Sequence, residues 1–119
     1  RDLKVKMKLS PMIDVIKGKR VIVVDDSIVR GTTSKRIVRM LKEAGAKEVH
    51  MRVSSPPTTD PCFYGVDTPN KDKLIAANMS QDDICKFIEA DSLAYLDEAS
   101  LLRSVNTTED NYCTACFTG

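Results

Sequence analysis

The sequence contains no tryptophan, and aromatic residues make up only 5% of its 119 residues. A hydrophobic core built from this chain must therefore be mainly aliphatic, and the 42% of residues that are hydrophobic are enough to form one. No apolar run approaches the ~20 residues that a membrane-spanning helix needs, and no signal-peptide pattern opens the chain. We therefore expect no membrane partner and a cytoplasmic location.

An excess of charge of either sign is also missing. Lysine and arginine together number 18 against 17 acidic residues, so the formal net charge is +1. This balance argues against a nucleic-acid-binding surface and against an acidic tail. At this length the chain fits one domain or part of one, and it shows no internal repeat.

The most informative segment is residues 21–33, which read VIVVDDSIVRGTT. Its first four residues are apolar and mostly β-branched, which predicts a strand buried on both faces. Asp25 and Asp26 follow at the carboxyl end of that strand, where open α/β sheets bind their ligands. The hydroxyl-rich loop after them leads into a predicted helix, so acid groups and the N–H groups of a helix start meet at one point. Carboxylates can hold ribose hydroxyls or a metal ion, and the N–H groups can hold a phosphate.

Simpler explanations exist for parts of this segment. Thr32 or Thr33 is a plausible helix N-cap, and capping uses the same N–H groups as phosphate binding. Receiver domains of response regulators also carry paired acids at a strand end, where they bind a metal ion. The loop that follows favours a phosphate site, because a receiver needs no phosphate-cradling loop directly after its acids. Arg30 could face a phosphate, solvent or a partner domain, and its role stays open.

The rest of the pattern predicts an α/β chain with a parallel sheet and flanking helices. Strands are expected over 3–9, 20–25, 49–53 and 92–96, with a right-handed βαβ crossover. Helical segments are expected over 11–16, 32–44, 71–78, 81–89 and 98–105. Gly45 stands where a left-handed residue would end the second of these helices, and Ser80 is the expected N-cap of the fourth. A loop with four prolines covers 54–69, and residues 106–111 are polar.

Four cysteines in an α/β chain without a secretory signal indicate reduced thiols or metal ligands rather than a disulfide scaffold. Cys113 and Cys116 form a CxxC in a polar tail, which disfavours a redox motif of the thioredoxin type, because that motif lies beside a βαβ pattern. Cys85 shares a helical stripe with two isoleucines and is expected in the core. The single histidine, His50, lies on a predicted strand and is expected to be structural.

The residues VDDSIVRGTT at 24–33 resemble the phosphoribosylpyrophosphate-binding signature of the type I phosphoribosyltransferases. The variant SIVRGTT resembles that of the glutamine phosphoribosylpyrophosphate amidotransferases in particular. Further motifs match this family in order: KLS at 8–10, EAGA at 43–46, SSPP at 54–57, PCFYGVD at 61–67, LIA at 74–76 and CTACFTG at 113–119. The resemblance covers essentially the whole chain. It implies a type I phosphoribosyltransferase-like parallel sheet with flanking helices, of which this chain is a partial domain.

The resemblance also implies a substrate-binding site, formed by Asp25, Asp26, Ser27, Ile28, Val29, Gly31, Thr32 and Thr33. Asp25 and Asp26 would contact the ribose hydroxyls directly or through Mg²⁺, which prefers oxygen ligands. Lys8 matches a family position near the nucleotide sites. No catalytic residue is expected in this chain, because the family's glutaminase nucleophile and its pyrophosphate loop lie upstream.

One branch of the family carries a [4Fe–4S] cluster on four cysteines. Cys62, Cys113 and Cys116 match three of these ligands, and the fourth would lie upstream of this chain. Four cysteine thiolates are the usual ligands of such a cluster. The resemblance therefore implies a cluster that is completed only in the longer protein.

The family's organisation assigns residues 1–105 to the C-terminal part of a phosphoribosyltransferase domain and residues 106–119 to a polar tail with the CxxC. The N-terminal glutaminase domain would be absent from this chain, which we expect to be an inactive excerpt of a longer protein. The implied activity is the transfer of glutamine-derived ammonia to phosphoribosylpyrophosphate, which gives 5-phosphoribosylamine in purine biosynthesis. Purine nucleotides are implied as feedback inhibitors, and a homo-oligomer as the assembly.

Two alternatives are open at this point. A non-catalytic regulatory module could use the same fold to sense phosphoribosylpyrophosphate, although the placed cysteines and the near-zero net charge argue against it. Another phosphoribosyltransferase would keep the loop, but it has no reason to carry the three matching cysteines. A basic DNA-binding face upstream would favour the regulatory module.

Overall fold

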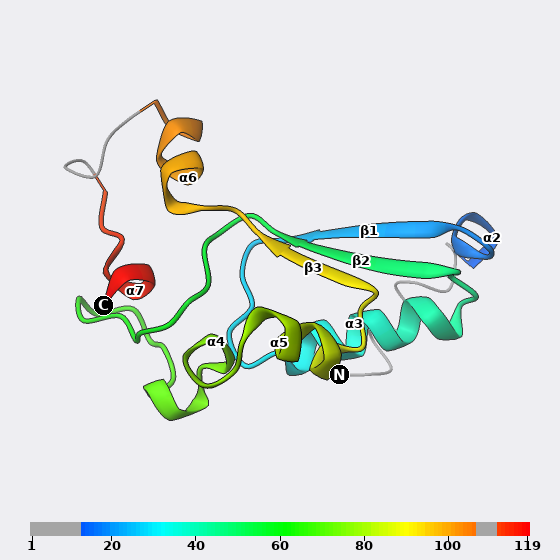
Figure 1. Cartoon of the computed structure of the whole chain (residues 1–119), viewed down its shortest axis with the longest axis horizontal. Coiled ribbons are helices and arrows are strands. Elements are labelled where there is room, and N and C mark those ends of the chain that lie inside the picture. Colours follow the sequence, from blue (N-terminus) through cyan, green and yellow to red (C-terminus); the bar gives the residue numbers. More distant parts are fainter. Residues whose placement is uncertain (1–12, 107–111) are drawn as a thin grey trace.

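A parallel three-stranded sheet forms the centre of the computed structural model, which describes residues 13–106 and 112–119. The strands are β1 (Arg20–Asp25), β2 (Glu48–Val53) and β3 (Ser92–Tyr95), in the order β1-β2-β3 (Figure 1). Both pairings are parallel, with Met51 of β2 opposite Val23 of β1 and Leu93 of β3. The predicted parallel α/β arrangement is therefore confirmed, whereas the predicted strand over 3–9 lies outside the described residues.

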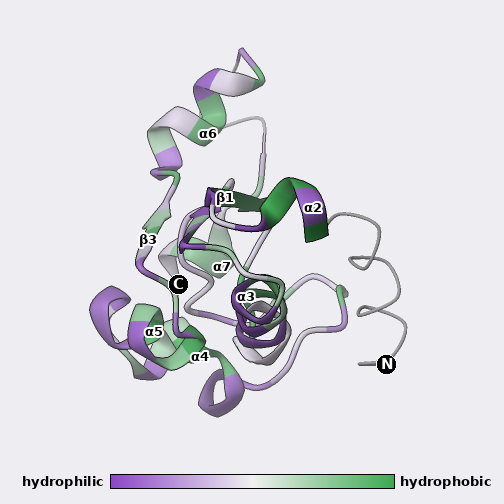
Figure 2. Cartoon of the chain, turned by 90° about the vertical axis from the view of Figure 1, so that its right-hand side faces the viewer, coloured by the Kyte–Doolittle hydropathy of each residue, from purple (hydrophilic) through white to green (hydrophobic). Residues whose placement is uncertain are grey.

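Helices cover one side of this sheet. α3 (Thr32–Glu43) follows β1, and α4 (Ile75–Asn78) and α5 (Gln81–Ile88) precede β3. All three lie together below the sheet in two views at right angles (Figures 1 and 2). Short helices α2 (Ile13–Ile16), α6 (Glu98–Ser104) and α7 (Ala115–Thr118) lie outside this layer. Among the described residues, no helix is long and apolar enough to cross a membrane.

The core lies between the sheet and this helical layer. β2 is at its centre, because Val49, Met51 and Val53 all point to the helices and are 0–3% exposed. Helix α3 contributes Val38 and Leu41, and other buried members come from the loops, α4, α5 and β3: Ile28, Ile75, Ile84, Ile88 and Leu93. The core is aliphatic, as the lack of tryptophan predicts.

The expectation that β1 is buried on both faces is wrong for the described residues. Val21 and Val23 pack against the core, but Ile22 is 65% exposed and Val24 is 72% exposed. The reason is that the described helices cover only one face, and that β1 is an edge strand of the described sheet. Continuous apolar sequence predicts the strand correctly, but it does not say what covers its second face.

The two ends of α3 differ from each other in how well the sequence predicts them. At its C-terminus Gly45 has φ +98°, its N–H donates to Lys42 O, and the Ala46 N–H donates to Leu41 O (both 3.0 Å). This is the left-handed glycine termination that the sequence predicts. At its N-terminus the cap residue is Gly31, with φ +83°, so the prediction of Thr32 or Thr33 as N-cap is wrong.

The predicted helix over 71–78 is split in two. A 3₁₀ turn, η2 (Lys71–Lys73), precedes α4, and Leu74 between them is extended and fully buried. Burial of the Leu74 side chain needs this break, because a continuous helix would carry that side chain in another direction. Ser80 caps α5 as predicted, since its side chain accepts a hydrogen bond from the Asp83 N–H at 3.2 Å.

Candidate functional site

A cavity of about 440 Å³ lies at the carboxyl end of β1. A single continuous stretch, residues 25–34, lines it. This stretch contains all eight residues predicted to bind substrate, and it adds two more. One is Arg30, which lies on the cavity wall, although the group that its side chain would bind stays open. The other is Ser34, which the sequence analysis did not include. Ser34 is only 3% exposed, and its position in the first turn of α3 is the signal that could have identified it.

The acid pair is ordered by short-range hydrogen bonds. The Asp26 N–H donates to Asp25 Oδ1 at 2.8 Å, and the Ser27 hydroxyl donates to Asp26 Oδ1 at 3.0 Å. The Asp25 carbonyl accepts from the Ser54 N–H at 2.9 Å, which fixes the end of β1 to the end of β2. The remaining carboxylate oxygens can accept sugar hydroxyls or contribute to a divalent cation site.

The start of α3 supplies backbone donors on the cavity wall. The first helical bond runs from Lys35 N–H to Gly31 O at 3.0 Å, so the N–H groups of Thr32, Thr33 and Ser34 have no acceptor within the helix. No side chain caps this end. Neither Thr32 nor Thr33 caps the helix with its side chain, so neither threonine competes with an anion for these N–H groups. These donors, together with the positive end of the helix dipole, can hold an anion.

Ile28 takes part in the site only through its backbone. It lines the cavity, but its side chain is 2% exposed and belongs to the hydrophobic core. The loop is therefore anchored in the core at Ile28, while the residues on either side of Ile28 also line the cavity. An anchored loop needs less ordering when a ligand binds.

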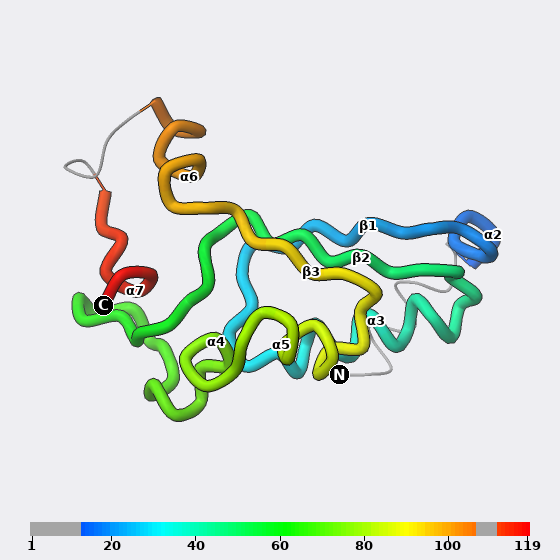
Figure 3. The backbone as a smooth tube through the Cα atoms, in the orientation of Figure 1, coloured from blue at the N-terminus to red at the C-terminus, as the bar shows by residue number. Residues whose placement is uncertain are grey.

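The three predicted cluster cysteines are all free thiols in one region of the molecule. The tail runs back beside the proline-rich loop (Figure 3), where the N–H groups of Thr59 and Asp60 donate to Cys116 O at 3.0 and 3.1 Å. Burial raises the pKa of Cys116, and Cys113, Cys62 and Asp60 are near enough to raise it further. Within residues 13–106 and 112–119, however, no three His, Cys, Asp or Glu side chains are grouped closely enough to hold a metal ion.

The turn around Cys62 favours the thiolate form. The Tyr64 N–H donates to Cys62 Sγ at 3.4 Å. Backbone N–H groups of Tyr64, Val66 and Gly65 lower the pKa of Cys62, with Tyr64 contributing most. A sulfur that accepts backbone hydrogen bonds is chemically suited to metal ligation, because the thiolate is the ligating form.

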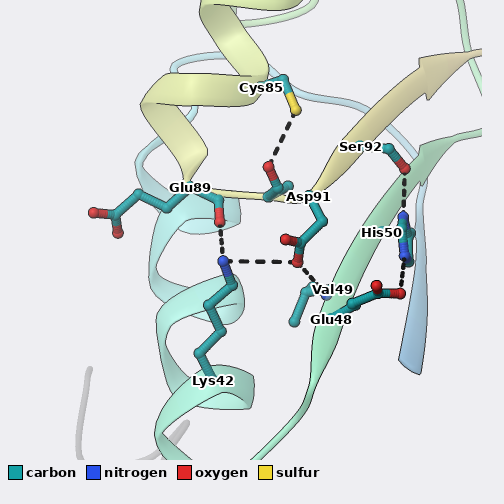
Figure 4. Close-up of polar contacts among 9 residues, drawn as sticks. Lys42, Glu48, Val49, His50, Cys85, Glu89, Asp91 and Ser92 are labelled. Carbon is teal, nitrogen blue, oxygen red and sulfur yellow. Dashed lines mark hydrogen bonds and ion pairs between the residues drawn. The ribbon is translucent and has the colours of Figure 1, made fainter. Parts of the chain in front are cut away.

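His50 and Cys85 belong to a structural network at the other end of the sheet (Figure 4). The His50 ring contacts Ser92 Oγ at 2.6 Å and Glu48 Oε2 at 3.1 Å, and the Cys85 thiol donates to Ala90 O at 3.3 Å. Burial raises the pKa of Cys85, which keeps it a neutral thiol. Neither residue lines the cavity at residues 25–34, in agreement with the structural roles expected for them.

A strand, an acid pair, a hydroxyl loop and a helix start, joined around one cavity, are the features of a phosphoribosyltransferase fold. The family model for the phosphoribosyl transferase domain matches residues 3–63, and the chain belongs to this family. Lys8 lies within this match but outside the described residues.

Similar proteins of known name indicate which phosphoribosyltransferases the chain resembles. The chain is similar to the amidophosphoribosyltransferase of Synechocystis sp., with 56% identity over 119 residues, which are 100% of this chain and 24% of that protein. It is 59% identical to the chloroplastic amidophosphoribosyltransferase of Glycine max, covering 100% of this chain and 21% of that protein. The glutamine phosphoribosylpyrophosphate amidotransferase from Bacillus subtilis, solved in complex with ADP and GMP, matches with a TM-score of 0.83 and 52% identity. That match covers 90% of this chain and 24% of the Bacillus chain. The chain thus spans less than a quarter of the length of these relatives.

Proposed function

We propose that this chain supplies the ribose-phosphate half of the transferase site of a glutamine-dependent amidophosphoribosyltransferase. The cavity at the end of β1, lined without interruption by residues 25–34, is the observation that carries the proposal. In the reaction, ammonia released from glutamine in another domain forms a bond to C1 of phosphoribosylpyrophosphate. The C1–oxygen bond to pyrophosphate breaks, which gives 5-phosphoribosylamine for purine biosynthesis.

Residues 27–33, here called the phosphate loop, would bind the 5-phosphate of the substrate. The N–H groups at the start of α3 and the hydroxyls of Ser27, Thr32 and Thr33 provide its donors. Asp25 and Asp26 would accept the ribose hydroxyls. These groups bind and orient the sugar, so that its C1 is held in place for the attacking ammonia.

The same acid pair would hold Mg²⁺. Both residues line the cavity, and their carboxylates are hard oxygen ligands of the kind that Mg²⁺ takes together with water and substrate oxygens. When bound, the ion would neutralise charge on the substrate's phosphate groups.

Cys62, Cys113 and Cys116 would hold a [4Fe–4S] cluster together with one cysteine from outside this chain. Two observations support this: the tail bonds to the proline-rich loop next to Cys62, and backbone donors favour the Cys62 thiolate. The transfer reaction has no redox step, so the cluster would be structural and would fasten the tail to that loop.

Further properties follow from the same proposal. Glutamine and phosphoribosylpyrophosphate are the substrates, purine nucleotides are feedback inhibitors, and the full-length protein is a cytoplasmic homo-oligomer. The regulatory alternative is not favoured, because the relatives named above are called amidophosphoribosyltransferases or, for the solved Bacillus structure, a glutamine phosphoribosylpyrophosphate amidotransferase.

The test is charge reversal at the acid pair in the full-length protein. Asp26→Lys should abolish phosphoribosylpyrophosphate turnover, because it places a cation where ribose hydroxyls or Mg²⁺ bind, while glutamine hydrolysis stays partly intact. Glu43→Lys, the same charge change at the exposed far end of α3, is the matched control and should leave turnover unchanged. Turnover near the wild-type level in Asp26→Lys would show that the site is elsewhere.

A further inference from the structure

The side of the phosphate loop that faces away from the cavity rests on residues far along the chain. A Cβ atom at Gly31 would lie 2.8 Å from Ile75 Cδ1 and 3.2 Å from Phe87 Cε1. Ile75 is only 7% exposed, and a methyl group at Gly31 would have to displace its Cδ1 atom toward a cavity of about 250 Å³ that Ile75 and Phe87 line. Close packing against α4 and α5 therefore favours glycine at position 31, in addition to its left-handed φ of +83°.

A backbone hydrogen bond fixes the same contact. The Ile75 N–H, at the first residue of α4, donates to Val29 O at 2.9 Å. Val29 lies in the middle of the phosphate loop, between the buried side chain of Ile28 and Gly31. The start of α4 thus holds the loop by one hydrogen bond and one close packing contact.

The turn that presents Ile75 is itself fastened. The Asn78 amide donates to three carbonyls of the η2–α4 junction, Leu74 O at 2.8 Å and Lys71 O and Asp72 O at 3.1 Å. Phe87 also has a cation–π contact with α3, because Lys35 Nζ lies 4.6 Å from the centre of its ring. Lys35 is also the residue that makes the first helical bond of α3.

We propose that Ile75 and Phe87 are positioning residues that hold the phosphate loop in its binding conformation. They do not line the 440 Å³ cavity, so they act on the ligand only through the loop backbone. This inference rests on the proposed function, since it assigns a task to residues beneath the same site. It predicts that disturbing the contact changes the affinity for the phosphorylated sugar more than it changes the rate of the chemical step.

A double-mutant cycle in the full-length protein tests the contact directly. Gly31→Ala should raise the KM for phosphoribosylpyrophosphate roughly tenfold or more, because a left-handed alanine is strained and its methyl meets Ile75 Cδ1. Valine lacks that Cδ1 atom, so Ile75→Val in the Gly31→Ala background should recover roughly threefold or more of the loss. Ile88→Val, at a fully buried site on α5 that does not supply any of the three atoms nearest to a Cβ at Gly31, is the matched control and should recover nothing.

The outcomes separate this inference from the proposed function. A high KM in Gly31→Ala that Ile75→Val does not lower would overturn the positioning role and leave the phosphate site standing. An unchanged KM in Gly31→Ala would also overturn the positioning role, and wild-type turnover and KM in both Gly31→Ala and Asp26→Lys would overturn the proposed function itself. If Gly31→Ala does not fold, Phe87→Leu is compared with Ile88→Val. Phe87→Leu should raise the KM with kcat nearly unchanged, and equal KM values in the two variants would overturn the inference.

Discussion

The phosphate loop and the cysteine region differ in how their parts are brought together. The cavity at β1 is lined by one unbroken stretch, residues 25–34. The cysteine region joins Cys62 to a tail about fifty residues further on, through hydrogen bonds from Thr59 and Asp60 to Cys116. One continuous segment supplies the whole lining of the first cavity, whereas the three thiols of the cysteine region, among the described residues, are not grouped closely enough to hold a metal ion. A continuous motif can line a cavity by itself, even where distant residues such as Ile75 support it, whereas a distributed ligand set depends on residues elsewhere in the protein.

The largest change expected from a single substitution in either region is the loss of iron at the cysteines. In the full-length protein, Cys113→Ser should lose most of its iron, because a hydroxyl is a poor replacement for a thiolate ligand. The tail should then come away from the proline-rich loop, and stability and activity should fall together. Iron and sulfide analysis after anaerobic purification measures this. Cys85→Ser is the control: its thiol bonds Ala90 O in the core, so its iron content should stay at the wild-type level.

Undiminished iron in Cys113→Ser would contradict the ligand assignment. Zinc in place of iron would keep the ligand set and show that the metal is different.

A smaller effect is expected at the opposite end of the sheet from the cavity. Asp91 Oδ2 accepts a hydrogen bond from the Val49 N–H at 2.7 Å and lies 3.7 Å from Lys42 Nζ (Figure 4). The Val49 N–H contributes most to lowering the pKa of Asp91. Asp91→Asn should therefore reduce the free energy of unfolding by about 1 kcal/mol at neutral pH, a value discounted for the exposure of the pair. The KM for phosphoribosylpyrophosphate should not change.

The pH dependence of this effect has a definite sign. Because the folded-state pKa of Asp91 is lowered, its stabilisation is present above the ordinary carboxyl pKa and is lost as the pH falls through the lowered value. The stability difference between wild type and Asp91→Asn, measured by urea unfolding, should shrink below about pH 4. A difference that grows in acid would contradict this role of the carboxylate.

Local sequence predicted the parts of the fold that depend on local chemistry. The apolar run before Asp25 predicted β1, and Gly45 and Ser80 predicted the end of α3 and the N-cap of α5. The acid pair and the hydroxyl loop were placed at one cavity because strand, loop and helix follow one another in the chain. Such features need no knowledge of distant residues.

Long-range packing explains the predictions that were wrong. The cap of α3 is Gly31 rather than a threonine, and a Cβ atom at this position would approach Ile75 Cδ1 and Phe87 Cε1 closely. Both lie more than forty residues away, so no local pattern could reveal them. The burial of Leu74 splits the helix predicted over 71–78. Whether the second face of β1 is covered depends on elements elsewhere in the protein, and the sequence of the strand does not specify them.

The most direct test of the central claim is a crystal structure of the full-length protein with ribose 5-phosphate bound. We expect the phosphate to lie within hydrogen-bond distance of N–H groups in residues 27–33, and the ribose hydroxyls to face Asp25 and Asp26. The loop should keep the contact between Val29 O and the Ile75 N–H. A sugar phosphate bound elsewhere, with the cavity at the end of β1 filled only by water, would contradict it.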